Sequence, residues 1–184
     1  VFSAPNGRIA GNRVGYNLEM KPLTNQTYYY DETFRSQIKS TAPGFLNQLQ
    51  GLTVIDIKGR DTSRTRVVTT LIHGNEPSGF IAGHIWLRSG KMPTTNVRII
   101  FCNTEAAQQR PIFTRRYVGE NECEDLNRYF GTPKEGAEPM LIQRANAIRQ
   151  AIEEVNPEAI IDLHNTSGLS GAFAVAVNDD EDMQ

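Results

Sequence analysis

Two apolar runs in this chain end on polar clusters that contain histidine. Residues 67–72 lead into the tetrapeptide H-G-N-E, which spans His73 to Glu76, and residues 159–161 lead into D-L-H, which ends at His164. In an open α/β sheet, ligands bind where strands end at their carboxyl edge. The feature therefore favours a fold in which two strand ends lie together, and it makes His73, Glu76 and His164 candidate metal ligands.

The spacing of these residues suits a zinc ion. A His and a Glu three positions apart in a turn can converge on one ion, and a distant second His completes three protein ligands, which leaves the fourth position for water. The H-x-x-E pattern alone is a weak signal, because two unrelated polar strand ends would look the same. The chain has only three histidines, however, and two of them occupy matching positions. We predict that His73, Glu76 and His164 bind zinc. The third histidine, His84, is expected to belong to the core or its rim.

Hydrophobic periodicity predicts strands that alternate with helices after residue 66. Strands are expected at 53–58, 66–72, 96–103, 159–163 and 172–177, and helices at 31–39, 80–87 and 138–154. The first two strands are expected to form a hairpin, and Pro43 and Gly44 to end the first helix. This order predicts an α/β fold, layered, with a mixed, largely parallel sheet and helices on both faces.

The composition describes an ordinary globular protein. A length of 184 residues is typical of one domain, and a net charge of −2 argues against a nucleic-acid partner. We expect an N-terminal cover segment at 1–50 and a domain that carries the candidate zinc site at 51–184. No apolar stretch is long enough to span a membrane. Cys102 ends an apolar run and Cys123 lies in an acidic loop, so no disulfide framework is indicated, and a cytoplasmic location is expected.

Four motifs in order carry a family resemblance. They are H-G-N-E-P-S-G from His73, R-Y at Arg116, D-L-N-R-Y-F from Asp125 and D-L-H-N-T-S-G from Asp162. Each is weak alone, but together, over residues 52–176, the chain resembles the aspartoacylase and succinylglutamate desuccinylase family of zinc carboxypeptidase-like enzymes. The resemblance implies a zinc-exopeptidase-like fold and zinc-dependent hydrolysis of an amide bond, of the N-acyl amino acid deacylase type.

The same resemblance implies roles for three further residues. Arg116 corresponds to an arginine that stabilises the oxyanion, although Arg115 competes for this role and a surface position is equally expected. Asn127 and Arg128 resemble a pair that binds the substrate carboxylate, which agrees with the two parallel donors of a guanidinium group. The expected substrate is a small carboxylate-bearing molecule or a peptide C-terminus. Asp125 is expected to be a structural cap or an arginine partner.

Two alternatives remain open: a metallocarboxypeptidase acting on peptides, and a non-catalytic module that retains the zinc or carboxylate site. A general base would discriminate between an enzyme and a binding module. The resemblance implies a glutamate from a later strand, beyond residue 184, so we expect the sheet to be incomplete at its C-terminal end and the chain to bind zinc but hydrolyse amides poorly. The other glutamates considered for this role are Glu105, Glu122, Glu124 and Glu181. The sequence predicts neither the acyl group nor the oligomeric state.

Overall fold

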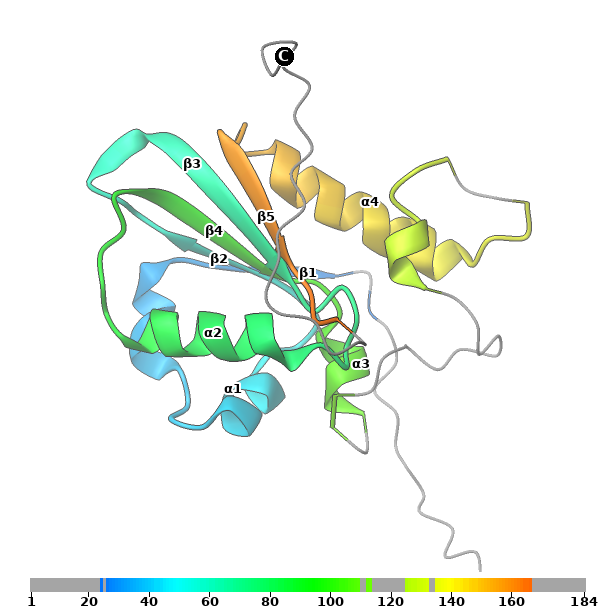
Figure 1. The fold of residues 1–184 in the computed structure, drawn as a ribbon, viewed down its shortest axis with the longest axis horizontal. Coiled ribbons are helices and arrows are strands. Elements are labelled where there is room, and N and C mark those ends of the chain that lie inside the picture. Colours follow the sequence, from blue (N-terminus) through cyan, green and yellow to red (C-terminus); the bar gives the residue numbers. More distant parts are fainter. Residues whose placement is uncertain (1–23, 25, 110–111, 114–124, 133–134, 167–184) are drawn as a thin grey trace, which may run out of the picture.

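A five-stranded sheet forms the centre of the molecule (Figure 1). The computed structural model describes residues 24, 26–109, 112–113, 125–132 and 135–166. The strand order is β1-β2-β4-β3-β5. The strands are β1 (Thr27–Tyr30), β2 (Leu52–Ile57), β3 (Asp61–Thr70), β4 (Thr95–Phe101) and β5 (Ala159–Leu163). β4, β3 and β5 run parallel, β2 is antiparallel to β4, and β1 is parallel to β2. The predicted mixed, largely parallel sheet is confirmed.

Helices pack on both faces of this sheet, as predicted (Figure 1). Neighbouring side chains of a strand point to opposite faces, so Ile100 packs in the cluster that contains Ile148 of α4, whereas Phe101 packs in the cluster that contains Phe80 of α2. The helices are η1 (Glu32–Gln37), α1 (Ala42–Gln48), α2 (Pro77–Arg88), α3 (Thr104–Gln108), η2 (Leu126–Arg128) and α4 (Pro139–Glu153). The sheet is thus a layer between α4 on one side and α1 and α2 on the other.

The predicted hairpin of the first two strands is wrong, because β4 lies between β2 and β3. The turn residues after β2 carry the chain across the start of β4 instead. There Arg60 N–H donates to Pro93 O and Asp61 N–H to Thr94 O. Gly59 packs so closely on this segment that an added Cβ would lie 2.2 Å from the carbonyl carbon of Thr95. Turn chemistry predicted a reversal correctly, but it does not specify which strand becomes the neighbour.

The N-terminal region differs from the prediction in two ways. A short helix is present at Glu32–Gln37, but Pro43 and Gly44 do not mark the end of helical structure; they lie in the first turn of α1. Thr41 caps this helix by accepting a hydrogen bond from Gly44 N–H at 3.2 Å, and proline is favoured in a first turn because it has no N–H to leave unpaired. The region predicted to cover the sheet also contributes β1, which pairs with β2.

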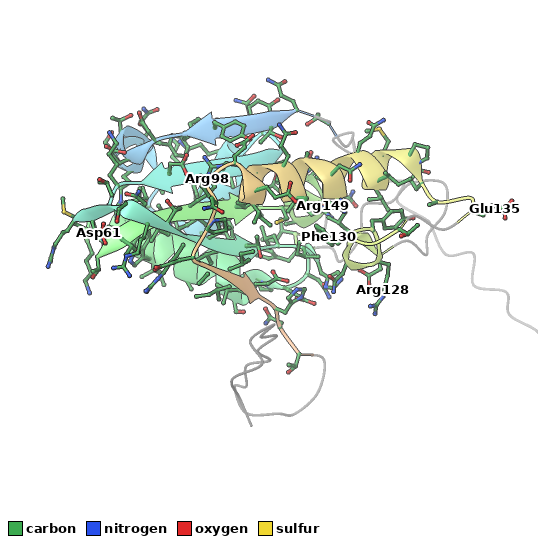
Figure 2. The ribbon with its side chains drawn as sticks, turned by 90° about the horizontal axis from the view of Figure 1, so that it is seen from above. Asp61, Arg98, Arg128, Phe130, Glu135 and Arg149 are labelled. Atoms are coloured by element: carbon green, nitrogen blue, oxygen red, sulfur yellow. The ribbon has the colours of Figure 1, made fainter. Side chains whose placement is uncertain are left out.

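Two arginines link α4 to the neighbouring elements, Arg98 to the sheet and Arg144 to α3. Arg98 of β4 donates to both carboxylate oxygens of Asp56, at 2.7 and 2.8 Å, and to Glu154 at the end of α4, at 3.0 Å (Figure 2). Arg144 of α4 is almost fully buried and forms a two-pronged ion pair with Glu105, at 2.6 and 3.1 Å. A buried charge is costly unless it is paired, so this second contact fixes the position of α4 strongly.

β5 is one of the two edge strands of the sheet that the structure describes, and Ile160 and Ile161 on it are 55% and 49% exposed. The strand predicted at 172–177 and Cys123 lie outside the described residues. Among the helices that are described, none combines the length and hydropathy required to cross a membrane.

Candidate metal centre

The candidate ligands lie together because β3 and β5 are parallel neighbours in register. Thr70 at the end of β3 pairs with Leu163 at the end of β5, so the residues that follow these strands leave the sheet side by side. His164 comes directly after β5, and His73 lies three residues beyond β3. Glu76 occupies the N-cap position of α2, immediately before Pro77. One strand end, one helix start and a second strand end therefore supply the three side chains.

The carboxylate of Glu76 lies between the two imidazole rings. Its Oε1 is 2.8 Å from His73 Nδ1, and its Oε2 is 2.9 Å from His164 Nδ1. One potential ligand atom from each residue can be chosen so that all three lie within 4.8 Å of one another. His73 and Glu76 are each 6% exposed, whereas the side chain of His164 is 29% exposed. The cluster is buried on the β3 side and accessible on the β5 side.

A second carboxylate binds the far nitrogen of each imidazole. His73 Nε2 lies 2.6 Å from Asp125 Oδ1, and His164 Nε2 lies 2.5 Å from Asp162 Oδ2. When Nε2 carries the proton and donates it to an aspartate, Nδ1 keeps a lone pair that faces the centre of the cluster. The hydrogen bond with Asp162 raises the pKa of His164 above its ordinary value, against the opposing effect of burial. The two aspartates therefore orient both rings with Nδ1 toward the Glu76 carboxylate.

Backbone contacts fix the position of Glu76. Its N–H donates to His73 O at 3.1 Å, which closes the turn between the two residues. The N–H of Asn165 donates to Glu76 Oε2 at 3.0 Å, and the side chain of Asn165 in turn accepts hydrogen bonds from Ser78. Glu76 is thus held both by the segment that follows β3 and by the segment that follows β5.

The donor set fits zinc. Two imidazole nitrogens and one carboxylate oxygen are a common set of protein ligands for a catalytic zinc ion, and such a set leaves a position for water. Two neutral imidazoles and one carboxylate also leave a divalent ion with net positive charge. The buried carboxylate of Glu76, directed at two ring nitrogens, is the arrangement that such an ion would stabilise.

Of the three residues predicted to bind or polarise the substrate, the structure describes two, Asn127 and Arg128. Asn127 and Arg128 belong to η2 and are exposed, and Figure 2 shows Arg128 projecting from this short helix. Asp125, the N-cap of η2, contacts His73, so the start of the D-L-N-R motif lies beside the candidate metal ligands. Arg116 lies outside the described residues. The predicted role of Asp125 as a cap is confirmed, since it accepts from Asn127 N–H at 3.0 Å.

Sequence reasoning missed the contact between Asp125 and His73. The two residues are 52 positions apart. No local periodicity links residues at such a distance. The hydrogen bond between Ser78 and Asn165, which are 87 positions apart, was missed for the same reason. The only available signal was that both pairs come from the four ordered motifs.

His84 and Cys102 are core residues, as predicted. His84 Nε2 lies 2.8 Å from Lys39 O, and its ring stacks on Phe45 with centroids 5.3 Å apart. Cys102 is fully buried, and this desolvation raises the pKa of its thiol far above the ordinary range. Neither residue is part of the candidate metal centre, so the cluster involves two of the three histidines of the chain.

The fold and this cluster define an α/β protein with a candidate metal-binding site at the carboxyl edge of its sheet. The family model described as the succinylglutamate desuccinylase/aspartoacylase catalytic domain matches residues 63–184. The chain therefore belongs to this family of hydrolases, and the suspected resemblance is confirmed. Comparison with curated proteins and with solved structures found no match. The family match begins within β3 and covers every candidate site residue.

Proposed function

We propose that this chain binds one zinc ion through His73, Glu76 and His164, and that the site serves hydrolysis of an amide bond in a small carboxylate-bearing substrate. The observation that supports this most directly is the Glu76 carboxylate held between the Nδ1 atoms of two imidazoles, at 2.8 and 2.9 Å. A zinc ion, when bound, supplies a Lewis acid and lowers the pKa of a water molecule toward neutrality.

The residues of the chain contribute orientation and charge. Asp125 and Asp162 set the ring positions of the two histidines, and the N–H of Asn165 sets the position of Glu76. Exposed Arg128 is proposed to bind the substrate carboxylate, with Asn127 adding a further donor, because a guanidinium group matches a carboxylate edge. Arg116 is proposed to stabilise the negative charge that develops on the scissile carbonyl oxygen.

Glu105 is excluded as a general base by its environment. It is 1% exposed and paired with Arg144 in the core, so it has no access to a substrate. Glu122, Glu124 and Glu181 lie outside the described residues.

Metal analysis with matched histidine variants tests the zinc site. The wild-type chain should bind one zinc per molecule; His73→Ala and His164→Ala should lose this stoichiometry, and His84→Gln, which changes the core histidine, should keep it. Retention of tightly bound zinc by His164→Ala would contradict the proposal. A parallel assay of N-acyl amino acids and short peptides separates deacylase from carboxypeptidase activity, and zinc binding without affinity for either substrate would favour the binding-module alternative.

A further inference from the structure

Leu71 adopts a backbone conformation that leucine rarely takes. Its φ is 58°, within the left-handed region that favours glycine. Such a residue is strained, and it persists only where the surrounding structure holds it in place. Leu71 is the first residue after β3 and precedes the proposed metal ligand His73 by two positions. The strain therefore lies directly between the sheet and the metal centre.

Burial holds Leu71 in this conformation. Its side chain is fully buried, in the hydrophobic cluster that also contains Phe80 of α2 and Phe101 of β4. On the strand side, Cys102 N–H donates to Thr70 O at 2.9 Å and so fixes the last residue of β3. The backbone on one side and the side chain on the other leave Leu71 little freedom to relax.

The left-handed residue ends β3 and redirects the chain. Thr70 still pairs with Leu163 in the sheet, yet only three residues later His73 takes part in a turn, with its carbonyl accepting from Glu76 N–H at 3.1 Å. A residue that stayed in the extended conformation would continue the direction of the strand instead. The change of direction brings the His73 ring to the Glu76 carboxylate.

We infer that Leu71 is a positioning residue for His73: its left-handed conformation, held by the core beneath α2, directs the His73 imidazole toward Glu76. The inference rests on the proposed zinc site. It predicts that zinc affinity depends on whether residue 71 tolerates the left-handed conformation, independently of how well its side chain fills the core.

Two substitutions of similar volume separate these effects. Leu71→Met keeps an unbranched Cβ, whereas Leu71→Ile has the same atoms as leucine but branches at Cβ, which strongly disfavours positive φ. Both replacements are well tolerated by hydrophobic cores, so both variants should fold. Zinc affinity, measured by competition with a chromophoric chelator, should fall about tenfold further in Leu71→Ile than in Leu71→Met.

In a third variant, Leu71→Gly, the stability of the fold and the affinity for zinc should change in opposite directions relative to Leu71→Ile. Leu71→Gly removes the buried side chain and should unfold at the lowest urea concentration of the three, but glycine accepts the left-handed conformation, so it should bind zinc more tightly than Leu71→Ile. Equal zinc affinities for the Met and Ile variants, or affinities that simply follow stability, would overturn the inference. If the wild-type chain bound no zinc, the proposed function itself would fail. Failure of the proposed function is therefore distinguishable from failure of the inference about Leu71, which concerns only the differences between variants.

Discussion

Asn165 and Ser78 link the end of β5 to the start of α2. The Oδ1 atom of Asn165 accepts hydrogen bonds from the hydroxyl of Ser78 at 2.6 Å and from its backbone N–H at 3.3 Å. The N–H of Asn165 simultaneously donates to the carboxylate of Glu76. The two residues come from different sequence motifs, and their contact makes the two motifs one structural unit around Glu76.

A double-mutant cycle should detect this link. Ser78→Ala and Asn165→Ala should each weaken zinc binding a few-fold, because a neutral hydrogen bond contributes about 0.5–1.5 kcal/mol, and the double variant should be little worse than either single variant. Chelator competition gives the affinities. Ser89→Ala is the control, since Ser89 makes a comparable hydrogen bond, to Trp86 O at 2.7 Å, at the other end of α2. Fully additive losses would contradict the link.

Gly79 should be required for the close approach of α2 to the sheet. A Cβ at this position would lie 2.4 Å from Thr70 Oγ1 and 2.7 Å from Leu163 Cβ, whereas a Cβ at Gly83 of the same helix would meet only the Phe101 ring, at 3.5 Å. Gly79→Ala should therefore destabilise the fold by about 1–3 kcal/mol and weaken zinc binding, while Gly83→Ala should be neutral or stabilising. Urea unfolding measures the difference; equal stabilities would show that α2 can move away without cost.

Loss of the negative charge of Glu105, the buried partner of Arg144, should lower the free energy of unfolding strongly. Glu105→Gln preserves shape but leaves the guanidinium of Arg144 without its countercharge in a site where both side chains are 1% exposed, so we expect about 3–5 kcal/mol of destabilisation. The matched control is Glu158→Gln, which breaks the solvent-exposed pair with Arg66 and should cost at most about 1 kcal/mol. Urea unfolding of both variants gives the comparison, and similar losses would mean that the buried pair has no special role.

Arg128→Ala tests the proposed carboxylate site. Loss of a charged partner for the substrate carboxylate should reduce transition-state stabilisation, seen in kcat/KM, by about 2–5 kcal/mol, with a corresponding loss of affinity for an N-acyl amino acid. Arg64→Ala is the control, because Arg64 pairs with Asp61 at the opposite end of the molecule from Arg128 (Figure 2). Unchanged substrate affinity in Arg128→Ala would remove this residue from the proposed site.

Most of the fold could be predicted because its elements have strong local periodicity. The apolar stripe of α4, which includes Leu141 and Ile148, and the runs that form β4 and β5 carry enough signal in adjacent residues. The position of β4 between β2 and β3 could not be predicted, because neighbour choice depends on a crossover through α2 and on contacts between distant residues such as Asp61 and Thr95. Local turn signals carry no such information.

The candidate ligands were likewise predicted from strand ends, whereas the contribution of Asp125 and Leu71 to the position of His73 was not. His73, Glu76 and His164 are recognisable because their residue types suit a metal. Asp125 contacts His73 only because the start of η2 lies against the turn that follows β3. The left-handed conformation of Leu71 cannot be read from the sequence either, because leucine would be expected to extend the strand. Residue type predicts candidate chemistry well, but long-range positioning comes from the fold.

The separation of the proposed ligands along the chain has a thermodynamic consequence. Glu76 and His164 are 88 positions apart, so an ion held by both would cross-link the start of α2 to the end of β5, one of the two edge strands of the described sheet. An ion that binds only the folded chain stabilises it by mass action, by about 4 kcal/mol when free zinc exceeds its dissociation constant a thousandfold. Under the proposed function, zinc supply would then affect not only the chemistry at the site but also the stability of the sheet edge that β5 forms.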